Sequence, residues 1–515
     1  MRIFDTYVQK LKYKVLTELA RQTWVGNDAF SVFNDIANQV VKKGEPTMSC
    51  CIYKDRAIVA ERIRIALGGK KEDHNVIQVI DIACDECPVA GHVVTDLCRG
   101  CVAHACVDAC KLGAITVDSH QKAEIDKSKC VECGKCAKSC PYSAIANFKR
   151  PCERACKVDA ISMAPDGVAQ IDSEKCIECG ACVYKCPFGA TLDVSSITDI
   201  IKTIVDSDDN KNYHVHAIVA PAIAGQFQYA KAGQLISAIR ELGFYAVEEV
   251  ALGADIVAYK EAQELQEKGF LTSSCCPAFV KYIKMKFPQL AEHISHNLSP
   301  MAETGKLIKE QDPDAKIVFI GPCTAKKGEV RKPEVHQYVD YVMTFEELQA
   351  MIDSKDIAVD QLPETELDTA TYYGRVFART GGLSEAVTEA VREQKAAAEA
   401  AKADAPDGAG TSGIVASGEA GASGKPASGD GACDGDSADS KPFVFDPIVC
   451  DGIDSCKTAL LRASKGLLPN NFIEGMVCTD GCIGGAACLS HGNADKRAID
   501  NYGKKASHKE IRDVL

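Results

Sequence analysis

Cysteines are the residues of this chain best suited to chemistry, and there are 27 of them among 515 residues. Two lie side by side in "LTSSCCPAFVKY" (271–282), directly after a short apolar run. A reducing compartment keeps thiols free to ligate metals or to catalyse. Residues 1–22 are charged and helix-periodic and lack the apolar segment of a secretion signal, so we expect a cytoplasmic, metal-binding protein.

Two cysteine runs have the spacing of iron-sulfur proteins. "CVECGKCAKSCP" (130–141) and "CIECGACVYKCP" (176–187) both read C-x2-C-x2-C-x3-C-P. This run wraps three thiolates around one 4Fe-4S cubane and lends the fourth to a neighbouring cluster. Zinc sites usually use C-x2-C pairs separated by a longer loop, so the spacing disfavours zinc.

An internal repeat doubles this pattern. Six cysteines recur 46 residues downstream: Cys106, Cys110, Cys130, Cys133, Cys136 and Cys140 correspond to Cys152, Cys156, Cys176, Cys179, Cys182 and Cys186. The repeat predicts two tandem ferredoxin-like 4Fe-4S modules within residues 80–195.

The usual exchange of ligands between paired clusters predicts three complete accessory cubanes. Their ligand sets are Cys98, Cys101, Cys106 and Cys140; Cys110, Cys130, Cys133 and Cys136; and Cys156, Cys176, Cys179 and Cys182. Cys152 and Cys186 lack two partners, because the repeat places Ala144 and Asn147 where cysteines should stand. Cys84 and Cys87 of "CDECP" would complete a fourth accessory cluster; alternatively, they are free or bind another metal.

From residue 213 onward, apolar strand-like runs alternate with amphipathic helices, as in "AKIVFIGPC". This pattern predicts an α/β domain over 213–505, with parallel sheets flanked by helices and ligand sites where strands end. The preceding modules are expected to be α+β. Residues 393–443 are rich in Ala, Gly, Ser and Asp and predict a low-complexity disordered insertion. Residues 1–79 are expected to be mainly helical.

Three cysteine stretches remain in the α/β region: "TSSCCPAF" (272–279), "GPCTAKKGE" (321–329) and "EGMVCTDGCIGG" (474–485). In this order, and downstream of two ferredoxin-like modules, they resemble the three signature loops that hold the catalytic H-cluster of FeFe-hydrogenases. "FARTGGLSEAV" (377–387) also resembles a segment of that family. The resemblance covers about residues 80–500 of the chain.

The resemblance implies an H-cluster, which is a 4Fe-4S cubane bridged to a diiron unit. Its cubane ligands would be Cys276, Cys323, Cys478 and Cys482, with the Cys482 sulfur bridging to the diiron unit. Cys275 would be the proton-transfer thiol, because a metal-bound thiolate has no proton to relay while a free neighbouring thiol has. Lys326 would donate to a diatomic ligand of the diiron unit, Glu329 matches an acidic residue of the same loop, and Met476 would pack against the cluster.

Glu261 and Glu264 in "KEAQEL", together with Ser295, would by resemblance continue the proton relay from Cys275 to the surface. From the residues alone, two glutamates at i and i+3 usually form a solvated helix face. Gly321 stands where many catalytic members have a methionine, and Asp480 where prototypes have glycine. These departures suggest a divergent subgroup.

We therefore expect a ferredoxin hydrogenase that reversibly reduces protons to molecular hydrogen, with three to four accessory 4Fe-4S clusters. Its expected partners are ferredoxin or a similar electron carrier and the maturation proteins that insert the diiron unit. Basic residues of "NFKRPCERACK" (147–157) would dock an acidic carrier. The alternatives are a hydrogen-sensing family member and a non-catalytic iron-sulfur scaffold or assembly protein that lacks the diiron unit.

Charge and hydropathy argue against other partners. The net charge is −13, with both signs mixed along most of the sequence, so no nucleic-acid surface is expected. No apolar run reaches about 18 residues, so no membrane span is expected. The 11 histidines show no ligand spacing, and none is assigned to a metal.

Overall fold

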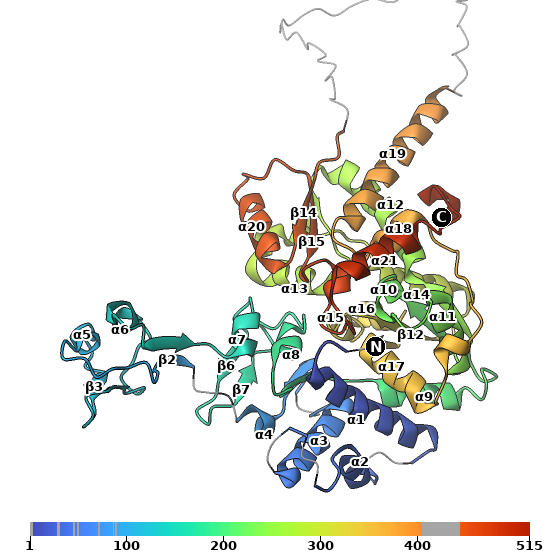
Figure 1. Cartoon of the computed structure of the whole chain (residues 1–515). Helices are drawn as coiled ribbons and strands as arrows, with labels where there is room; N and C mark the ends of the chain where they lie inside the picture. Colours follow the sequence, from blue (N-terminus) through green and yellow to red (C-terminus); the bar gives the residue numbers. More distant parts are fainter. Residues whose placement is uncertain are drawn as a thin grey trace, which may run out of the picture.

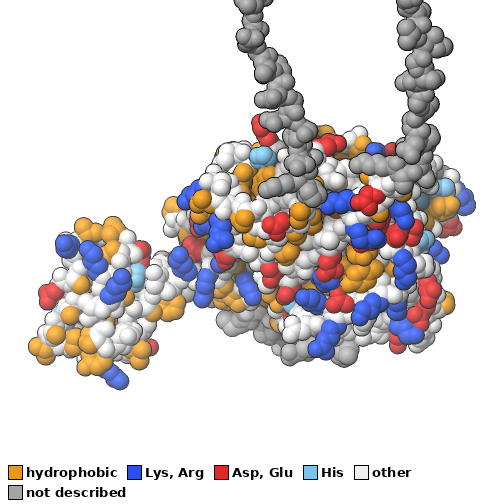
Figure 2. All heavy atoms as spheres, turned by 90° about the horizontal axis from the view of Figure 1, so that it is seen from above, with side chains coloured by type: hydrophobic (Ala, Val, Ile, Leu, Met, Phe, Trp, Pro, Cys, Tyr) orange, Lys and Arg blue, Asp and Glu red, His pale blue; other side chains and the backbone are white. Residues whose placement is uncertain are grey.

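The computed structural model describes residues 4–27, 31–44, 47–48, 51–70, 73–85, 87, 90–403 and 443–515. Two small iron-sulfur modules lead into a larger body, and the first module projects from it (Figure 1). In the space-filling view this module forms a separate lobe (Figure 2). Among the described residues, no helix combines the length and the apolar character that crossing a membrane requires.

Each module is built from short antiparallel strand pairs and one-turn helices. The first contains β2 (Gly91–Val94), α5 (Ala105–Asp108), β3 (Ile115–Val117), β4 (Ala123–Ile125), α6 (Lys135–Ser139) and β5 (Ile145–Phe148). The second contains α7 (Pro151–Ala155), β6 (Ile161–Met163), β7 (Ala169–Ile171), α8 (Ala181–Lys185) and β8 (Thr191–Asp193). Strands β2 and β5, β3 and β4, and β6 and β7 pair antiparallel. The predicted α+β class of the modules is confirmed.

The helices near the amino terminus are α1 (Tyr7–Trp24), α2 (Phe33–Val40), α3 (Ile52–Ala66) and α4 (Asp81–Cys84). Strand β1 (Ile77–Val79) pairs antiparallel with β8, the last strand of the second module. Helix α1 begins with a capping box between Thr6 and Gln9. Its apolar face, including Leu16 and Leu19, belongs to one hydrophobic core with helices and strands of the larger body. Burial of this face fixes α1 against the body, since apolar area removed from water stabilises by about 25 cal/mol per Å².

The larger body contains two parallel sheets. One has the order β10 (Ala246–Glu249), β9 (Val215–Val219), β12 (Lys316–Gly321) and β13 (Tyr341–Thr344). The other has the order β11 (Leu271–Thr272), β15 (Phe472–Met476) and β14 (Pro447–Asp451). Register is set by pairs such as Ile218 with Phe319 and Thr272 with Ile473. Parallel sheets require crossover connections, and helices supply them here.

The α-helices of this body are α9 (Ile197–Asp206), α10 (Ile223–Gln226), α11 (Ala232–Glu241), α12 (Val250–Lys268), α13 (Pro277–Lys286), α14 (Pro300–Gln311), α15 (Ala325–Glu329), α16 (Pro333–His336), α17 (Phe345–Ser354), α18 (Tyr372–Val376), α19 (Gly382–Ala403), α20 (Ile453–Ala463) and α21 (Asn493–Gly503). Short 3-10 helices are η1 (Pro288–His293), η2 (Val359–Gln361), η3 (Cys482–Gly484) and η4 (Ile511–Val514). The predicted α/β class with parallel sheets flanked by helices is confirmed.

One boundary of the expected insertion needs correction. Helix α19 continues to Ala403, so residues 393–403 are helical rather than part of a disordered segment. The stretch contains alanines, glutamate and lysines, which are good helix formers, and it extends a helix already begun at Gly382. The remainder of the expected insertion, apart from Phe443, lies outside the described residues. The other domain boundaries stay predictions.

Candidate functional site

The first cysteine loop links strand β11 to helix α13. Cys276 is the N-cap residue of α13, with extended φ −98°, and Pro277 occupies the first helical position, where its missing N–H costs nothing. Ser273 is buried behind the loop and accepts a hydrogen bond of 3.1 Å from the Gly475 N–H. That bond joins the first loop to β15, which carries the third.

The second loop follows strand β12 and leads into helix α15. Cys323 stands just before this helix, which carries Lys326 and Glu329. Thr324 Oγ1 donates to the backbone carbonyl of Glu178 at 2.7 Å, and Lys281 Nζ lies 3.1 Å from a carboxylate oxygen of Glu178. Glu178 belongs to the second iron-sulfur module, so these contacts dock that module beside the loop.

The third loop follows strand β15 and places Cys478 and Cys482. Gly481 has φ +77°, and a Cβ there would lie 2.7 Å from Thr380 N, so only glycine fits. Asp480 also adopts the left-handed region, with φ +66°, a conformation that aspartate tolerates better than most residues. Asp480 thus stands in a backbone conformation that most often carries glycine.

The carboxyl ends of β11, β12 and β15 meet at one cavity, as expected for ligand sites in parallel sheets. The sequence-predicted residues that line it are Cys275, Cys276, Cys323, Lys326, Met476, Cys478 and Cys482. None of the described cysteines forms a disulfide. Burial raises the pKa of Cys323 to about 11 and that of Cys482 to about 12, so without a bound cation these thiols stay protonated. A metal is the partner that would turn them into thiolates.

The Lys326 ammonium is the one cation that lines this cavity among the described residues. The residue is 7% exposed, and Nζ lies 2.6 Å from Glu329 Oε2. Burial opposes the charge on Lys326, but Glu329 outweighs it and raises the lysine pKa. Despite this ion pair, Nζ has no hydrogen bond of good geometry to any described residue. A buried donor of this kind fits an acceptor held in the cavity.

Gly321 precedes the second loop, and an aromatic ring fills the space beside it. A Cβ at Gly321 would lie 2.6 Å from the Phe319 ring and 3.2 Å from Ala220 Cβ. Phe319 also lines the cavity. The ring therefore occupies the space that a larger residue at position 321 would need.

A chain of acidic side chains leads from Cys275 toward the surface. Glu261 is fully buried, and burial raises its pKa to about 7. The Glu261 carboxylate accepts a hydrogen bond from Ser274 N at 3.3 Å. Burial raises the pKa of Cys275, and the charge of the nearby Glu261 adds to this rise. The expectation from the residues alone, that both glutamates lie on a solvated helix face, is therefore wrong for Glu261.

Ser295 and Glu264 continue this chain. Ser295 Oγ donates to Glu264 Oε2 at 3.3 Å. Burial raises the pKa of Glu261, and Ser295 is near enough to lower it in part. Glu264 lies 2.7 Å from both Lys268 Nζ and His296 Nδ1. Burial would raise the pKa of Glu264, but these two neighbours lower it. The sequence analysis did not predict His296 or Lys268 as part of the site. The spacing of four residues on one helix, which places Lys268 beside Glu264, could have indicated Lys268.

The first module brings its cysteines together around one small core, and the division into two ligand sets stays a prediction. Burial raises the pKa of Cys106, and Cys140 and Cys101 add to the rise. Burial likewise raises the pKa of Cys136, with Cys130 and Cys133 as the neighbouring thiols. Cys98 and Cys110 pack against the same small core.

The second module repeats the arrangement. Cys156, Cys176 and Cys179 all lie close enough to Cys182 to raise its pKa after burial. In both modules the amide four residues on donates to a cysteine sulfur: Ala114 to Cys110, Ala144 to Cys140, Ala160 to Cys156 and Ala190 to Cys186, at 3.3–3.4 Å. The sequence repeat is therefore also a structural repeat.

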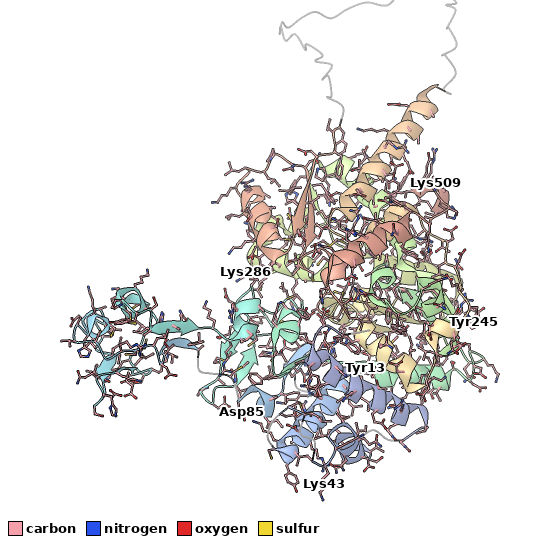
Figure 3. All side chains as sticks on the ribbon, in the orientation of Figure 1. Tyr13, Lys43, Asp85, Tyr245, Lys286 and Lys509 are labelled. Carbon is pink, nitrogen blue, oxygen red and sulfur yellow. The ribbon has the colours of Figure 1, made fainter. Side chains whose placement is uncertain are left out.

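The structure brings Cys84 and Cys87 to the two cysteines that lacked partners. Cys84, Cys152 and Cys186 share one hydrophobic cluster. Burial raises the pKa of Cys152 to about 11, with Cys186 and Cys84 contributing, and Cys186 and Cys84 also neighbour Cys87. Asp85, which follows Cys84, marks this place between the modules and the amino-terminal helices (Figure 3).

Arg150 corrects one expectation about the basic segment 147–157. Its side chain is buried rather than exposed, and Nη1 lies 2.6 Å from Gly167 O and 3.7 Å from Cys84 Sγ. Arg150 cannot contact a docking protein in this position. Lys149, Arg154 and Lys157 remain exposed.

Cys179 connects the second module to the cavity. Burial raises its pKa to about 12, and Cys276 is among the thiols that contribute. Cys179 in turn contributes to the raised pKa of Cys478. Cys488, missed by the sequence analysis, supports the third loop because its buried sulfur donates to Ile483 O at 3.2 Å. A lone cysteine outside a spacing motif offers no signal for such a role.

Comparison with protein families gives two matches. Residues 213–486 match the family described as the iron only hydrogenase large subunit, C-terminal domain. Residues 97–144 and 150–190 match a 4Fe-4S dicluster domain.

Several curated proteins are similar to the chain. Iron hydrogenase 1 of Clostridium pasteurianum is 30% identical over 308 residues, which cover 54% of this chain and 52% of that protein. The periplasmic Fe hydrogenase large subunit of Nitratidesulfovibrio vulgaris is 29% identical, over 49% of this chain and 61% of that protein. The cytosolic Fe-S cluster assembly factor NAR1 of Kluyveromyces lactis is 37% identical over 95 residues, 18% of this chain and 20% of that protein. The chain thus spans little more than half the length of the two hydrogenases.

Among solved structures, FeFe-hydrogenase HydA1 from Chlamydomonas reinhardtii aligns with 20% identity and a TM-score of 0.45. The aligned region covers 62% of this chain and 92% of the HydA1 chain.

Proposed function

This chain belongs to the iron-only hydrogenase family, and from that premise we propose that it is an FeFe-hydrogenase that interconverts protons and electrons with molecular hydrogen. One observation carries the proposal: Cys275 and the buried Lys326 ammonium line the same cavity as four further thiols. Four thiols suffice for a cubane. The additional free thiol can carry a proton, and the ammonium can donate hydrogen bonds to a group held beside the cubane.

The residues fit an H-cluster. When bound, this cofactor supplies the site at which protons and electrons combine into hydrogen. Cys276, Cys323, Cys478 and Cys482 would hold its cubane, with Cys482 shared with the diiron unit. Lys326 Nζ would donate to a diatomic ligand, and Met476 would exclude water by packing against the cluster.

The proton path would run from Glu264 at the surface through Ser295 and Glu261 to Cys275. Glu264, which lies beside His296 and Lys268, would exchange protons with solvent. The Ser295 hydroxyl can pass a proton because it both donates and accepts. Glu261, with a pKa of about 7, can hold or release a proton near neutral pH, which suits a relay group.

Electrons would enter through the accessory clusters. The first module projects from the body and is accessible to a carrier such as ferredoxin (Figure 2). The second module lies between it and the body, and its Cys179 neighbours both Cys276 and Cys478. Cys84, Cys87, Cys152 and Cys186 would hold the fourth accessory cluster. Maturation proteins would insert the diiron unit, and the cytoplasmic location stays a prediction.

A second candidate function is iron-sulfur cluster assembly, because relatives named as assembly factors match part of the chain. Cys275 and Lys326 favour the hydrogenase, since a protein without a diiron unit needs neither.

Infrared spectroscopy of anaerobically matured full-length protein separates the candidates. Metal-bound carbonyl and cyanide bands together with hydrogen production from reduced ferredoxin or viologen are expected. Iron-loaded protein without any such band would support an assembly role and overturn the proposal. Bands accompanied by hydrogen binding but only very slow turnover would replace it with a sensory role.

A further inference from the structure

Two histidines that the sequence analysis left unassigned converge on one carboxylate. His214 immediately precedes strand β9, and His216 lies within it, so their side chains point to the same face. Asp312 follows helix α14 as its C-cap residue. One ligand atom from each of these three residues lies within 4.8 Å of the other two.

We propose that His214, His216 and Asp312 bind a divalent transition-metal ion of the zinc class, independently of the iron-sulfur clusters. Imidazole nitrogen and carboxylate oxygen form a ligand set that such ions favour. The site lies at the amino-terminal edge of the parallel sheet, opposite to the edge that carries Cys323. Tyr245, which stacks on His214 with ring centroids 3.8 Å apart, marks its position on the side of the body away from the modules (Figure 3).

The hydrogen bonds of His216 leave its second nitrogen aimed into the site. His216 Nδ1 lies 2.8 Å from Glu248 Oε1 and donates to this carboxylate, as metal-bound histidines commonly do. Nε2 then carries a lone pair and lies 3.9 Å from Asp312 Oδ2, too far for a hydrogen bond. The residue is only 7% exposed, and Nε2 has no hydrogen-bond partner among the described residues. A buried lone pair facing a carboxylate is stabilised by a cation between them.

The charges around the site also call for a cation. Among the described residues, the basic side chains within ion-pair distance of Asp312 and Glu248 are His214 and His216, and no lysine or arginine neutralises either carboxylate there. His214 Nδ1 lies 2.7 Å from Asp312 Oδ2, so a modest opening of this contact would admit the ion. His214 is 38% and Asp312 29% exposed at the side chain, which leaves room for water as a fourth ligand. Such an ion would tie the start of β9 to the end of α14.

Zinc binding tests this site in the cluster-loaded protein. The full chain, treated anaerobically with a chelator, is dialysed against Zn²⁺ at neutral pH, and bound zinc is counted per chain. We expect one Zn²⁺ bound by the wild type and at least about tenfold weaker binding in His214→Ala and His216→Ala. His214→Ala serves as the second variant because its side chain is partly exposed and its loss leaves the core intact. His336→Ala, an exposed histidine on α16, is the matched control and should bind zinc normally.

X-ray absorption at the zinc edge excludes zinc held by vacant cysteine sites. Nitrogen and oxygen neighbours at about 2.0–2.1 Å support the proposal, whereas sulfur at about 2.3 Å as the main neighbour overturns it. Glu248→Gln tests the positioning role of Glu248 and should weaken zinc binding by about 10- to 100-fold without changing the neighbour shell. Equal zinc binding in the wild type and both histidine variants, or no zinc binding in the wild type, would overturn the proposal.

Discussion

Lys327 and Asp193 form a fully buried ion pair, Nζ to Oδ2 2.7 Å, that joins the second signature loop to the last strand of the second iron-sulfur module. Lys327 also pairs with Glu347 at 2.8 Å. Lys12 of helix α1 reaches the same network through Asp193 and through Glu346, at 2.5 and 2.7 Å. Burial would raise the pKa of Asp193, but Lys12 and Lys327 lower it well below its usual range. Three parts of the chain therefore meet at one charge cluster beside Lys326.

Lys327→Met should destabilise this junction strongly. Removing one partner of a buried ion pair leaves uncompensated charge and costs about 3–5 kcal/mol. Trp24, the single tryptophan of the chain, donates to Ser354 Oγ at 3.0 Å and so reports the packing of α1 on α17. A lowered unfolding midpoint, followed by Trp24 fluorescence, is expected. Lys211→Met, which removes the exposed pair with Asp208, should cost about 0–1 kcal/mol; equal effects would argue against the network as a tertiary clamp.

Adjacent cysteines should respond differently to substitution. Cys275→Ala should keep the H-cluster bound, because the four cubane thiols remain, but remove most hydrogen production, because the last proton donor is gone. Cys276→Ala should weaken the cubane itself. Viologen-driven hydrogen production should fall in both variants, and infrared bands should survive only in the first. Loss of the bands in both, or near-normal turnover in Cys275→Ala, would reject the relay role.

Glu261 should make stability depend on pH. Burial raises its pKa from 4.5 to about 7. Between these values the folded protein keeps a proton that the unfolded chain has released, so stability falls as pH rises through this window, by about 3 kcal/mol in total. The glutamine in Glu261→Gln cannot ionise, so this variant should lose that part of the pH dependence of stability. It should also lose most hydrogen production.

Unfolding midpoints at about pH 5 and about pH 8 measure this slope. Glu292→Gln, an exposed glutamate in η1, is the control and should behave as the wild type. Identical slopes in Glu261→Gln and the wild type would contradict a buried, titrating Glu261.

Cys84→Ser combined with Cys87→Ser should remove one accessory cluster. With four accessory cubanes and an H-cluster, matured protein would carry about twenty-two irons, and the double variant about four fewer. Iron analysis and cluster electron paramagnetic resonance measure the difference. Cys51→Ser, an exposed cysteine assigned to no cluster, should leave the count unchanged. An unchanged iron count in the double variant would show that Cys84 and Cys87 are free thiols or bind another metal.

The sequence alone predicted the features that local spacing determines. The C-x2-C-x2-C-x3-C-P runs and their repeat predicted two α+β modules, since one short loop supplies most ligands of a cubane. Alternation of apolar strands and amphipathic helices predicted the parallel sheets, and with them that the three cysteine loops follow strand ends. These patterns act over a few residues to a few tens of residues, so the order of residue types is enough to reveal them.

Tertiary structure alone decided which distant groups meet and which are buried. Packing of α4 against the second module brings Cys84 to Cys152 and Cys186, which the sequence left as one of two alternatives, and it buries Arg150, which looks like a surface residue in sequence. Of two adjacent lysines, Lys326 faces the cavity and Lys327 enters an ion-pair network with strand β8, because helical rotation points neighbours in different directions. His214 and His216 find Asp312 only because β9 and the end of α14 are packed together. Burial and long-range contact depend on how whole elements pack, and no local pattern of residues encodes that.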